Sequence, residues 1–307
     1  MNVDRRSVLC TGLAAALAAC DRAAPPKLPA YADAPVARDG LQHVVFGIHP
    51  LHNPQLLAQK YGPLMAYLSR SVPGTQFELE ASIDYAEYER KLREGRHAFS
   101  LPNPLHAVMA RSWGYKVIAR MGDNSQFRGI FIVRKDSPVT QVQDLRGQVV
   151  AYPAPTALAA AMMPQLYLHE HGLDVEREVQ NRYVGTHNSS IMNAYLGQSA
   201  ASATWPAAWA GFQKANPKEA AELKVLWETP TLIQNAVIVR QDVPADMQSR
   251  VAGLLAGLGQ HAEGRTILQG ADTDSFVLSD DREFDVVLNF LREYKSKVKK
   301  EANPVVP

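Results

Sequence analysis

The chain has 307 residues, of which 46% are hydrophobic, and its 32 basic and 31 acidic residues give a formal net charge of +1. This balance supplies no basic field to attract nucleic acid, and the length is ample for one large or two medium lobes with a core of their own. Both cysteines, Cys10 and Cys20, lie near the start, so the remainder cannot form a disulfide and must be stable through its core.

The first 20 residues have the features of an export leader. Two arginines at positions 5–6 precede a short apolar run, which ends in Leu-Ala-Ala-Cys at residues 17–20. The run is shorter than the ~20 apolar residues that a membrane-spanning helix needs. The pattern resembles the bacterial lipobox, which implies cleavage before Cys20 and a lipid on its thiol.

We therefore expect a lipoprotein signal peptide at residues 1–19 and a lipid attachment at Cys20. Residues 20–40 are rich in Ala, Pro and charge without periodicity, which is typical of a tether. An ordinary secretion signal with an incidental cysteine is the alternative. Asp21 resembles the signal for retention at the inner membrane in enteric bacteria, while the paired arginines leave both the general and the twin-arginine export routes open.

Strand patterns alternate with helix patterns along the rest of the chain. Residues 43–48 are a short apolar run that ends before Pro50, as in a buried strand, whereas residues 54–71 place apolar side chains at helical spacing. Further strands are expected at 76–81, 99–101, 117–120, 129–133, 148–152, 178–184, 200–204, 223–227 and 234–240. Further helices are expected at 85–94, 105–112, 156–171, 187–196, 206–216 and 244–258, with two more behind. This alternation predicts an α/β fold with mostly parallel sheets.

Short segments between residues 43 and 294 have the order and spacing of one known family. They are 46–50, 53–54, 61–64, 84–85, 92–95, 133–138, 144–147, 172–174 and 185–188. Together they resemble the phosphate, phosphite and phosphonate substrate-binding proteins of ABC transporters. The resemblance implies the type II periplasmic-binding fold, in which two α/β lobes are joined by two crossing strands.

Mapped onto this chain, the resemblance places lobe one at residues 41–133 plus 236–307. Lobe two would be residues 134–235. The crossing strands are expected near residues 132–134 and 236–239.

Four strand-to-helix junctions and the start of the helix behind Asp84 are expected to face the cleft between these lobes. In open α/β sheets, ligands lie off the carboxyl ends of the strands, where helix N-termini present free N–H groups. The junctions carry hydroxyl, amide and imidazole groups, which can hold a small oxyanion without a metal or cofactor. The expected ligand-binding residues are His49, Asn53, Tyr85, Asn103, His106, Thr156, Ala157, His187 and Asn188.

The chain also departs from the pattern that the resemblance implies. The family's phosphate loop is rich in Ser and Thr before a Gly, whereas residues 155–160 keep only the hydroxyl of Thr156 and lack the Gly. One acidic residue is the amide Asn188 here, a second has no counterpart, and His106 replaces a tyrosine. Because a carboxylate accepts a hydrogen bond from a protonated ligand oxygen, we expect weaker selection for a protonated oxyanion. His106 and His187 could instead donate to a fully charged one, or to a ligand of a quite different kind.

Plainer roles compete with these assignments. Tyr85 could simply pack, and His106 could be a solvated helix cap. Trp205 and Trp209 could line the cleft or belong to the core.

The sequence predicts neither a metal site nor catalysis. The histidine pairs 49 with 52 and 169 with 171 have no cysteine or paired carboxylate beside them, so structural roles are expected. The chain has no Gly-x-Ser-x-Gly elbow, no Gly-rich phosphate loop and no His-Glu-x-x-His motif.

The sequence therefore predicts a monomeric, lipid-anchored periplasmic protein that captures a small oxyanion for an ABC permease. The alternative is a sensor with a different ligand class, whose closed form signals to a membrane kinase.

Overall fold

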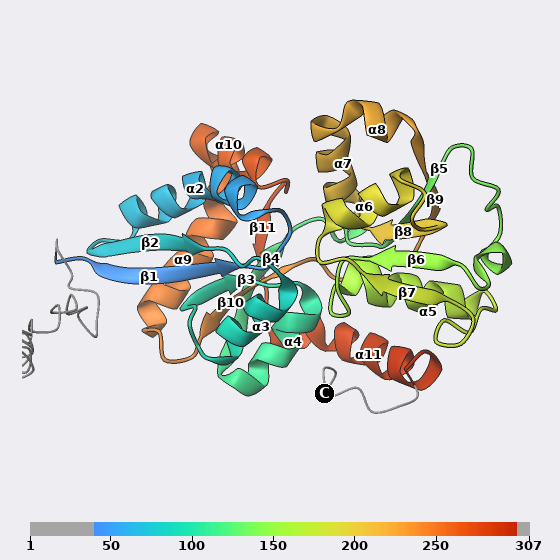
Figure 1. The fold of residues 1–307 in the computed structure, drawn as a ribbon. Coiled ribbons are helices and arrows are strands. Elements are labelled where there is room, and N and C mark those ends of the chain that lie inside the picture. Colours follow the sequence, from blue (N-terminus) through green and yellow to red (C-terminus); the bar gives the residue numbers. More distant parts are fainter. Residues whose placement is uncertain (1–39, 300–307) are drawn as a thin grey trace, which may run out of the picture. The chain divides into compact units, whose positions relative to one another are not determined.

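The computed structural model describes residues 40–299, which belong to one compact unit. The chain builds two sheets there, and helices cover both of them (Figure 1). The expected signal peptide, the lipid site Cys20 and all of the expected tether except Gly40 lie outside the described residues. None of the helices between residues 40 and 299 is long and apolar enough to cross a membrane.

The first sheet has six strands in the order β11, β4, β10, β3, β1, β2. Its strands are β1 (Gln42–Ile48), β2 (Thr75–Glu80), β3 (Phe99–Leu101), β4 (Tyr115–Met121), β10 (Ala236–Arg240) and β11 (Phe276–Leu278). β1 is parallel to β2 and β3, while β10 is antiparallel to β3 and β4. The strands β3 and β10 are buried along most of their length, as expected for a sheet covered on both faces.

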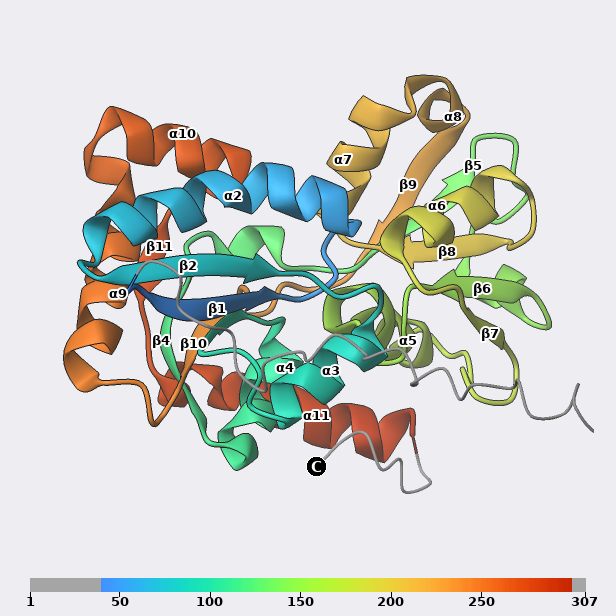
Figure 2. The ribbon, with the colours of Figure 1, turned by 60° about the vertical axis from the view of Figure 1, so that its left-hand side comes forward.

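Helices cover both faces of the first sheet, and Figure 2 shows α2 and α10 above it and α3 and α4 below it. The helices of this lobe are α2 (Pro54–Ser71), α3 (Tyr85–Arg93), α4 (Pro104–Ala110), α9 (Ala245–Gly257), α10 (Ala262–Gly270) and α11 (Asp285–Lys297). The first of these follows the sequence pattern closely. The Asn53 side chain caps it by accepting from the Leu56 N–H at 2.9 Å, and Leu57, Tyr61 and Leu64 form part of its buried stripe.

The second sheet has five strands in the order β7, β6, β8, β5, β9. Its strands are β5 (Ile130–Arg134), β6 (Val149–Tyr152), β7 (Gln180–Tyr183), β8 (Ala201–Thr204) and β9 (Leu223–Glu228). Its helices are α5 (Met163–Glu170), α6 (His187–Tyr195), α7 (Pro206–Ala215) and α8 (Pro217–Ala221). Only β5 runs against its neighbours, so the expectation of mostly parallel α/β sheets is confirmed. The sequence patterns missed β11 and α8.

The chain passes from the first sheet to the second several residues earlier than expected. The strand β5 pairs with β8 and β9, so residues 130–133 belong to the second lobe, although the expected boundary placed them in the first. The crossings are the segments 122–129 and 229–235, and the Thr229 N–H donates to the Gly129 carbonyl at 2.9 Å between them. An apolar run identifies a buried strand but not the sheet that it joins, which explains the shift.

The helix expected at residues 156–171 begins instead with a π-helical turn, Leu158–Met162, which continues into α5. Pro164 explains the change because it has no N–H to donate to the preceding turn and would clash there in a regular α-helix. The wider turn therefore sets the position of the loop before α5.

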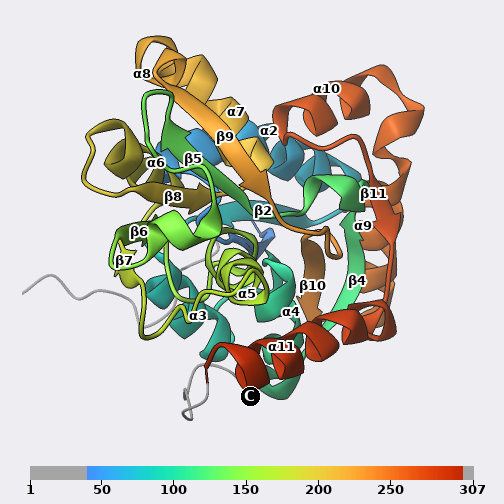
Figure 3. The same cartoon turned by 90° about the vertical axis from the view of Figure 1, so that its right-hand side faces the viewer.

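The C-terminal helix α11 joins the two lobes, although it was expected to belong to the first alone. Figures 1 and 3 show it passing beneath α4 and reaching α5. The Tyr294 hydroxyl donates to Gln165 in α5, and the Lys297 ammonium lies 2.9 Å from the Glu170 carboxylate. This helix therefore constrains how far the lobes can separate.

Gly129, in the first crossing segment, lies very close to the π-helical turn and the start of α5. A methyl group there would overlap the Ala159 carbonyl oxygen and the Pro164 ring. We expect Gly129→Ala to lower the free energy of unfolding by about 1–3 kcal/mol in urea denaturation, as overpacking does. The matched control is Gly253→Ala on the exposed face of α9, where no atom lies within 4 Å. It should stabilise by about 1 kcal/mol, and equal effects of the two changes would contradict the tight crossing.

Candidate functional site

A small cavity lies between the lobes, beside the crossing segments. Its volume of about 10 Å³ is room for roughly one water molecule, so the lobes are closed on each other. The lining residues are His49, Leu51, Tyr85 and Asn103 from the first lobe, Ala157, Leu158, Ala159, Ala160, His187 and Trp205 from the second, and Phe127 and Asn235 from the crossings.

The ends of strands and the starts of helices place these side chains. His49 and Trp205 directly follow β1 and β8, and Asn103 lies between β3 and α4. Tyr85 and His187 are the first residues of α3 and α6, which Asp84 and Thr186 cap. The carboxyl ends of parallel strands meet at one edge of a sheet, so the cavity lies where this architecture usually holds ligands.

Tyr85 and His187 connect the two lobes. The Tyr85 hydroxyl lies 3.2 Å from His187 Nε2, and His187 Nδ1 lies 3.1 Å from the Thr204 hydroxyl. Burial lowers the pKa of His187 to about 3 and raises the pKa of Tyr85 above its usual range. Both side chains are therefore neutral and meet through a hydrogen bond that exists only when the lobes are closed.

A second interlobe connection forms around Glu89 of α3. The Thr156 hydroxyl donates to Glu89 Oε1 at 2.5 Å, His106 Nε2 lies 2.9 Å from the same oxygen, and Asn103 Nδ2 donates to the Thr156 carbonyl at 3.0 Å. Burial opposes ionisation of Glu89, but the bonds from His106 and Thr156 outweigh it and keep its pKa below the usual value. The Thr156 hydroxyl is the one that remains here of the family's phosphate loop, and it donates to the Glu89 carboxylate and does not point into the cavity.

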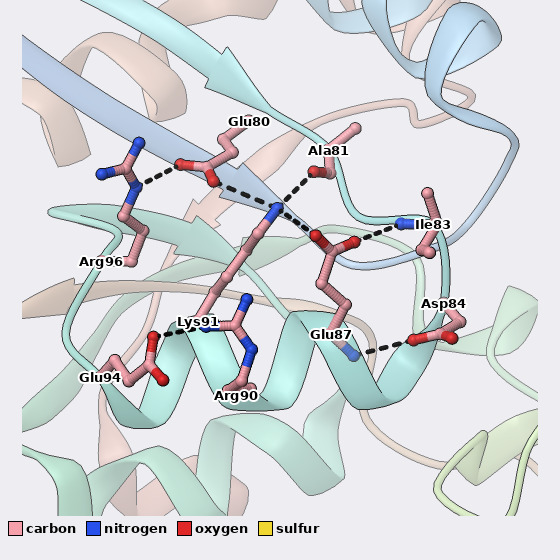
Figure 4. A network of polar contacts seen from close by, with 9 residues as sticks. All are labelled: Glu80, Ala81, Ile83, Asp84, Glu87, Arg90, Lys91, Glu94 and Arg96. Atoms are coloured by element: carbon pink, nitrogen blue, oxygen red, sulfur yellow. Dashed lines mark hydrogen bonds and ion pairs between the residues drawn. The ribbon is translucent and has the colours of Figure 1, made fainter. Parts of the chain in front are cut away.

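A network on the first lobe holds the loop that carries Tyr85 (Figure 4). The Lys91 ammonium lies 3.1 Å from both Glu80 and Glu87 and donates to the Ala81 carbonyl at 3.0 Å. Glu87 in turn accepts from the Ile83 N–H at 2.8 Å. These contacts tie the end of β2 to α3, so the first residue of α3 has a fixed position.

Several polar groups at the cavity have no partner among the described residues. Trp205 Nε1 and Asn235 Oδ1 are buried and make no hydrogen bond within residues 40–299. The N–H groups of Leu158 and Ala159, at the start of the π-helical turn, likewise find no acceptor in the described part of the chain. Buried polar groups in native proteins nearly always have partners, so this set indicates a ligand.

His49 contributes one further polar atom. Its Nδ1 lies 2.8 Å from the Leu101 carbonyl oxygen, so this nitrogen carries the hydrogen. Burial lowers the pKa of His49 to about 3, which leaves Nε2 as a bare acceptor. The lining contains no Lys, Arg, Asp or Glu, so the cavity offers neutral groups and helix dipoles only.

The structure brings together five of the nine expected binding residues. His49, Tyr85, Asn103, Ala157 and His187 line the cavity.

Three of the other four line two neighbouring openings. Asn53 and Asn188 line the first together with His187, and Thr156 lines the second, beside Glu89. His106 is wholly buried and lies behind Tyr85, against Glu89. In this closed form His106 Nε2 meets Glu89 and His187 Nε2 meets Tyr85, so the expected donation to a charged ligand stays a prediction.

Sequence reasoning missed Asn235, Phe127 and Glu89, and left the role of Trp205 open. Asn235 and Phe127 belong to the crossings, whose position no periodic pattern reveals. Trp205 had a usable signal, since it directly follows a strand and precedes Pro206 at a helix start. Within residues 40–299, no group of three or more metal-binding side chains comes together.

Comparison with known proteins identifies the family. Residues 46–284 match the family described as ABC transporter, phosphonate, periplasmic substrate-binding protein. A probable ABC transporter phosphite-binding protein, PhnD1 from Prochlorococcus marinus (strain MIT 9301), is 21% identical over 135 residues. That alignment covers 41% of this chain and 46% of the relative, so the match spans about half the length of that protein.

Solved structures agree with the fold. The binding-protein component of an ABC phosphonate transporter from Pseudomonas aeruginosa has a TM-score of 0.77 at 17% identity, covering 86% of this chain and 90% of that one. PhnD1 of P. marinus with methylphosphonate has a TM-score of 0.75 at 17% identity, covering 82% and 98%. XAC2383 of Xanthomonas citri bound to ATP has a TM-score of 0.66 at 17% identity, covering 83% and 98%.

The type II periplasmic-binding fold is thereby confirmed, with two α/β lobes around a cavity. The family match covers far more than half of the sequence. This chain belongs to the phosphonate-type periplasmic substrate-binding proteins of ABC transporters.

Proposed function

We propose that this protein captures a small phosphorus oxyanion, such as a phosphonate, in the cavity between its lobes and presents it to the permease of an ABC importer. The observation that carries the proposal is the set of unpartnered donors at this cavity: Trp205 Nε1 and the N–H groups of Leu158 and Ala159. Donors at the start of a helix suit an anion, because the helix dipole adds to their hydrogen bonds.

The ligand class rests on the cavity and not on the likeness of folds. At the same 17% identity, one similar structure holds methylphosphonate and another holds ATP. A cavity with room for one water in the closed form favours a ligand of few atoms, which the lobes would admit by a small hinge opening. Its apolar side, with Leu51 and Phe127, suits a short alkyl substituent.

The remaining parts of the proposal come from the sequence. A lipid on Cys20 would hold the protein at the membrane, with the inner membrane favoured by Asp21, and residues 20–40 would give the lobes reach to the permease. The chain would act by binding alone, without cofactor or catalysis. In the alternative, a sensor, the same site would bind the ligand and a membrane kinase would take the place of the permease as partner.

A thermal unfolding screen tests the ligand class directly. Phosphate, phosphite and methylphosphonate are added to residues 21–307, with sulfate, small carboxylates and amines as controls. A ligand at a hundred times its dissociation constant should raise the free energy of unfolding by about 2.7 kcal/mol. A shift with phosphorus oxyanions supports the importer, whereas no shift with any of them contradicts the proposal and favours the sensor with another ligand.

Tyr85→Phe tests whether the interlobe hydrogen bond supports binding. The change removes the bond to His187 and leaves a buried nitrogen unpaired, so ligand affinity should fall about 5- to 30-fold in calorimetry. Tyr67→Phe is the matched control, because its hydroxyl meets His261 at 3.4 Å within the first lobe. Equal affinities of the two variants would show that Tyr85 only packs.

Acidic pH should weaken the closed protein. The pKa values of His49 and His187 are lowered to about 3 in the closed form from an ordinary value near 6.5, and that of His97 to about 4. The unfolded chain therefore binds protons that the folded one excludes. The stability that these histidines provide is complete above pH 6.5 and declines as pH falls, by up to about 1.4 kcal/mol per pH unit for each.

Urea unfolding between pH 7.5 and 5 measures this slope above the range in which most carboxylates titrate. His187→Gln should make this slope smaller, because the unfolded variant no longer has that imidazole to take up a proton. A wild-type free energy that stays level over this range would show that the histidines are protonated in the folded state.

A further inference from the structure

His49 is held as a hydrogen-bond acceptor by the sheet behind it. A carbonyl oxygen can only accept, so the Leu101 carbonyl at 2.8 Å fixes the hydrogen on Nδ1 and leaves a lone pair on Nε2. The side chain is only 2% exposed, and no described residue donates to Nε2. The ring therefore cannot turn over without losing its bond to Leu101.

The groups packed around His49 cannot satisfy this lone pair. The rings of Tyr85 and Tyr88, both on α3, lie 6.3 and 6.2 Å away between centroids. The Tyr85 hydroxyl is bonded to His187 and the Tyr88 hydroxyl to Ser100, at 2.7 Å.

The other titratable neighbours are also histidines. Burial is the main cause of the low pKa of His49, and His106, His187 and His52 lower it further, while the Leu101 carbonyl alone raises it. A donor to Nε2 must come from the ligand or from water.

Most of the remaining polar groups of the cavity have the opposite character. Trp205 Nε1 can only donate, as can the N–H groups of Leu158 and Ala159. The Asn235 amide nitrogen donates to Met121 Sδ at 3.6 Å, which leaves Oδ1 as a second unpaired acceptor. The lining therefore fits a small molecule that has several acceptor oxygens and a hydroxyl group.

We propose that His49 makes this cavity selective for an oxyanion that keeps one hydroxyl group, the singly protonated phosphonate, over an anion of equal shape and charge that has none. The inference rests on the proposed function and names the form of the ligand that the site takes. The phosphonate hydroxyl donates to His49 Nε2, and its two other oxygens accept from Trp205 and the helix start. His49 thus supplies the acceptor that the family's missing carboxylate would have provided.

An anion without a hydroxyl would bring an oxygen lone pair against that of His49. A buried acceptor left unpaired costs about 1–3 kcal/mol, and sites built to bond a hydroxyl reject analogues that lack it by large factors. In this proposal His49 maintains selection for a protonated ligand, whereas the missing carboxylate alone led us to expect weaker selection.

Methylphosphonate and methanesulfonate form the matched ligand pair. Below the second pKa of methylphosphonate both are monoanions of nearly equal shape, and only methylphosphonate has a hydroxyl. Titration calorimetry on the full chain, expressed in a bacterial host and purified, should give at least about 100-fold tighter binding of methylphosphonate. Above that second pKa, its affinity should fall about tenfold per pH unit, because the bound form becomes scarce.

Two variants assign the selection to its residue. His49→Leu removes the acceptor, while the backbone N–H of residue 49 still donates to the Leu101 carbonyl at 3.2 Å. Its preference for methylphosphonate should shrink to within about tenfold. Trp205→Phe removes a donor that both ligands use, so both affinities should fall and their ratio should persist.

Each outcome separates the two proposals. Equal wild-type affinities for the two ligands would overturn the selection by His49 and leave the proposed function in place. Binding of neither ligand would overturn the proposed function and the inference with it. An unchanged ratio in His49→Leu would remove His49 as the determinant, and if that variant does not fold, an affinity of the wild type that is level through the second pKa would do the same.

Discussion

The closing lobes must give a partner to each polar group that they remove from water, and this constraint governs the structure around the cleft. A buried group without a partner costs more than the hydrogen bond itself contributes. Tyr85 and His187 satisfy each other across the cleft, and Glu89 is satisfied by Thr156 and His106. At the small cavity Trp205 Nε1 and Asn235 Oδ1 remain unpaired, which makes it the candidate binding site.

The same constraint explains how the chain departs from its family pattern without losing a binding site. The hydroxyl of Thr156 serves lobe closure, so the helix start behind it presents backbone N–H groups in place of side chains. Trp205 follows the neighbouring parallel strand β8 and adds a donor at the same edge of the sheet. For the small anion that we propose, a neutral cavity formed in this way offers directed hydrogen bonds, so the preference would depend on the pattern of donors and acceptors more than on charge.

Closure is also a property of the scaffold. The crossing segments are bonded through Gly129 and Thr229, and α11 joins both lobes through Tyr294 and Lys297. Tyr85 and Thr156 make their hydrogen bonds across the cleft with other residues, so opening can break those bonds while these connections persist. Small hinge motions of this kind suit a ligand of few atoms.

The sequence by itself determined the α/β class, most of the elements and five of the residues that line the cavity. Local rules suffice there: apolar spacing distinguishes strands from helices, Asn53 and Asp84 cap helices, and side chains at strand ends such as His49 face the cleft. Only the tertiary structure decided that β5 joins the second sheet, that His106 turns toward Glu89 and that Asn235 and Trp205 complete the cavity. Each of these depends on contacts between residues far apart in the chain, and the protonated edge of His49 depends on a carbonyl that belongs to another strand.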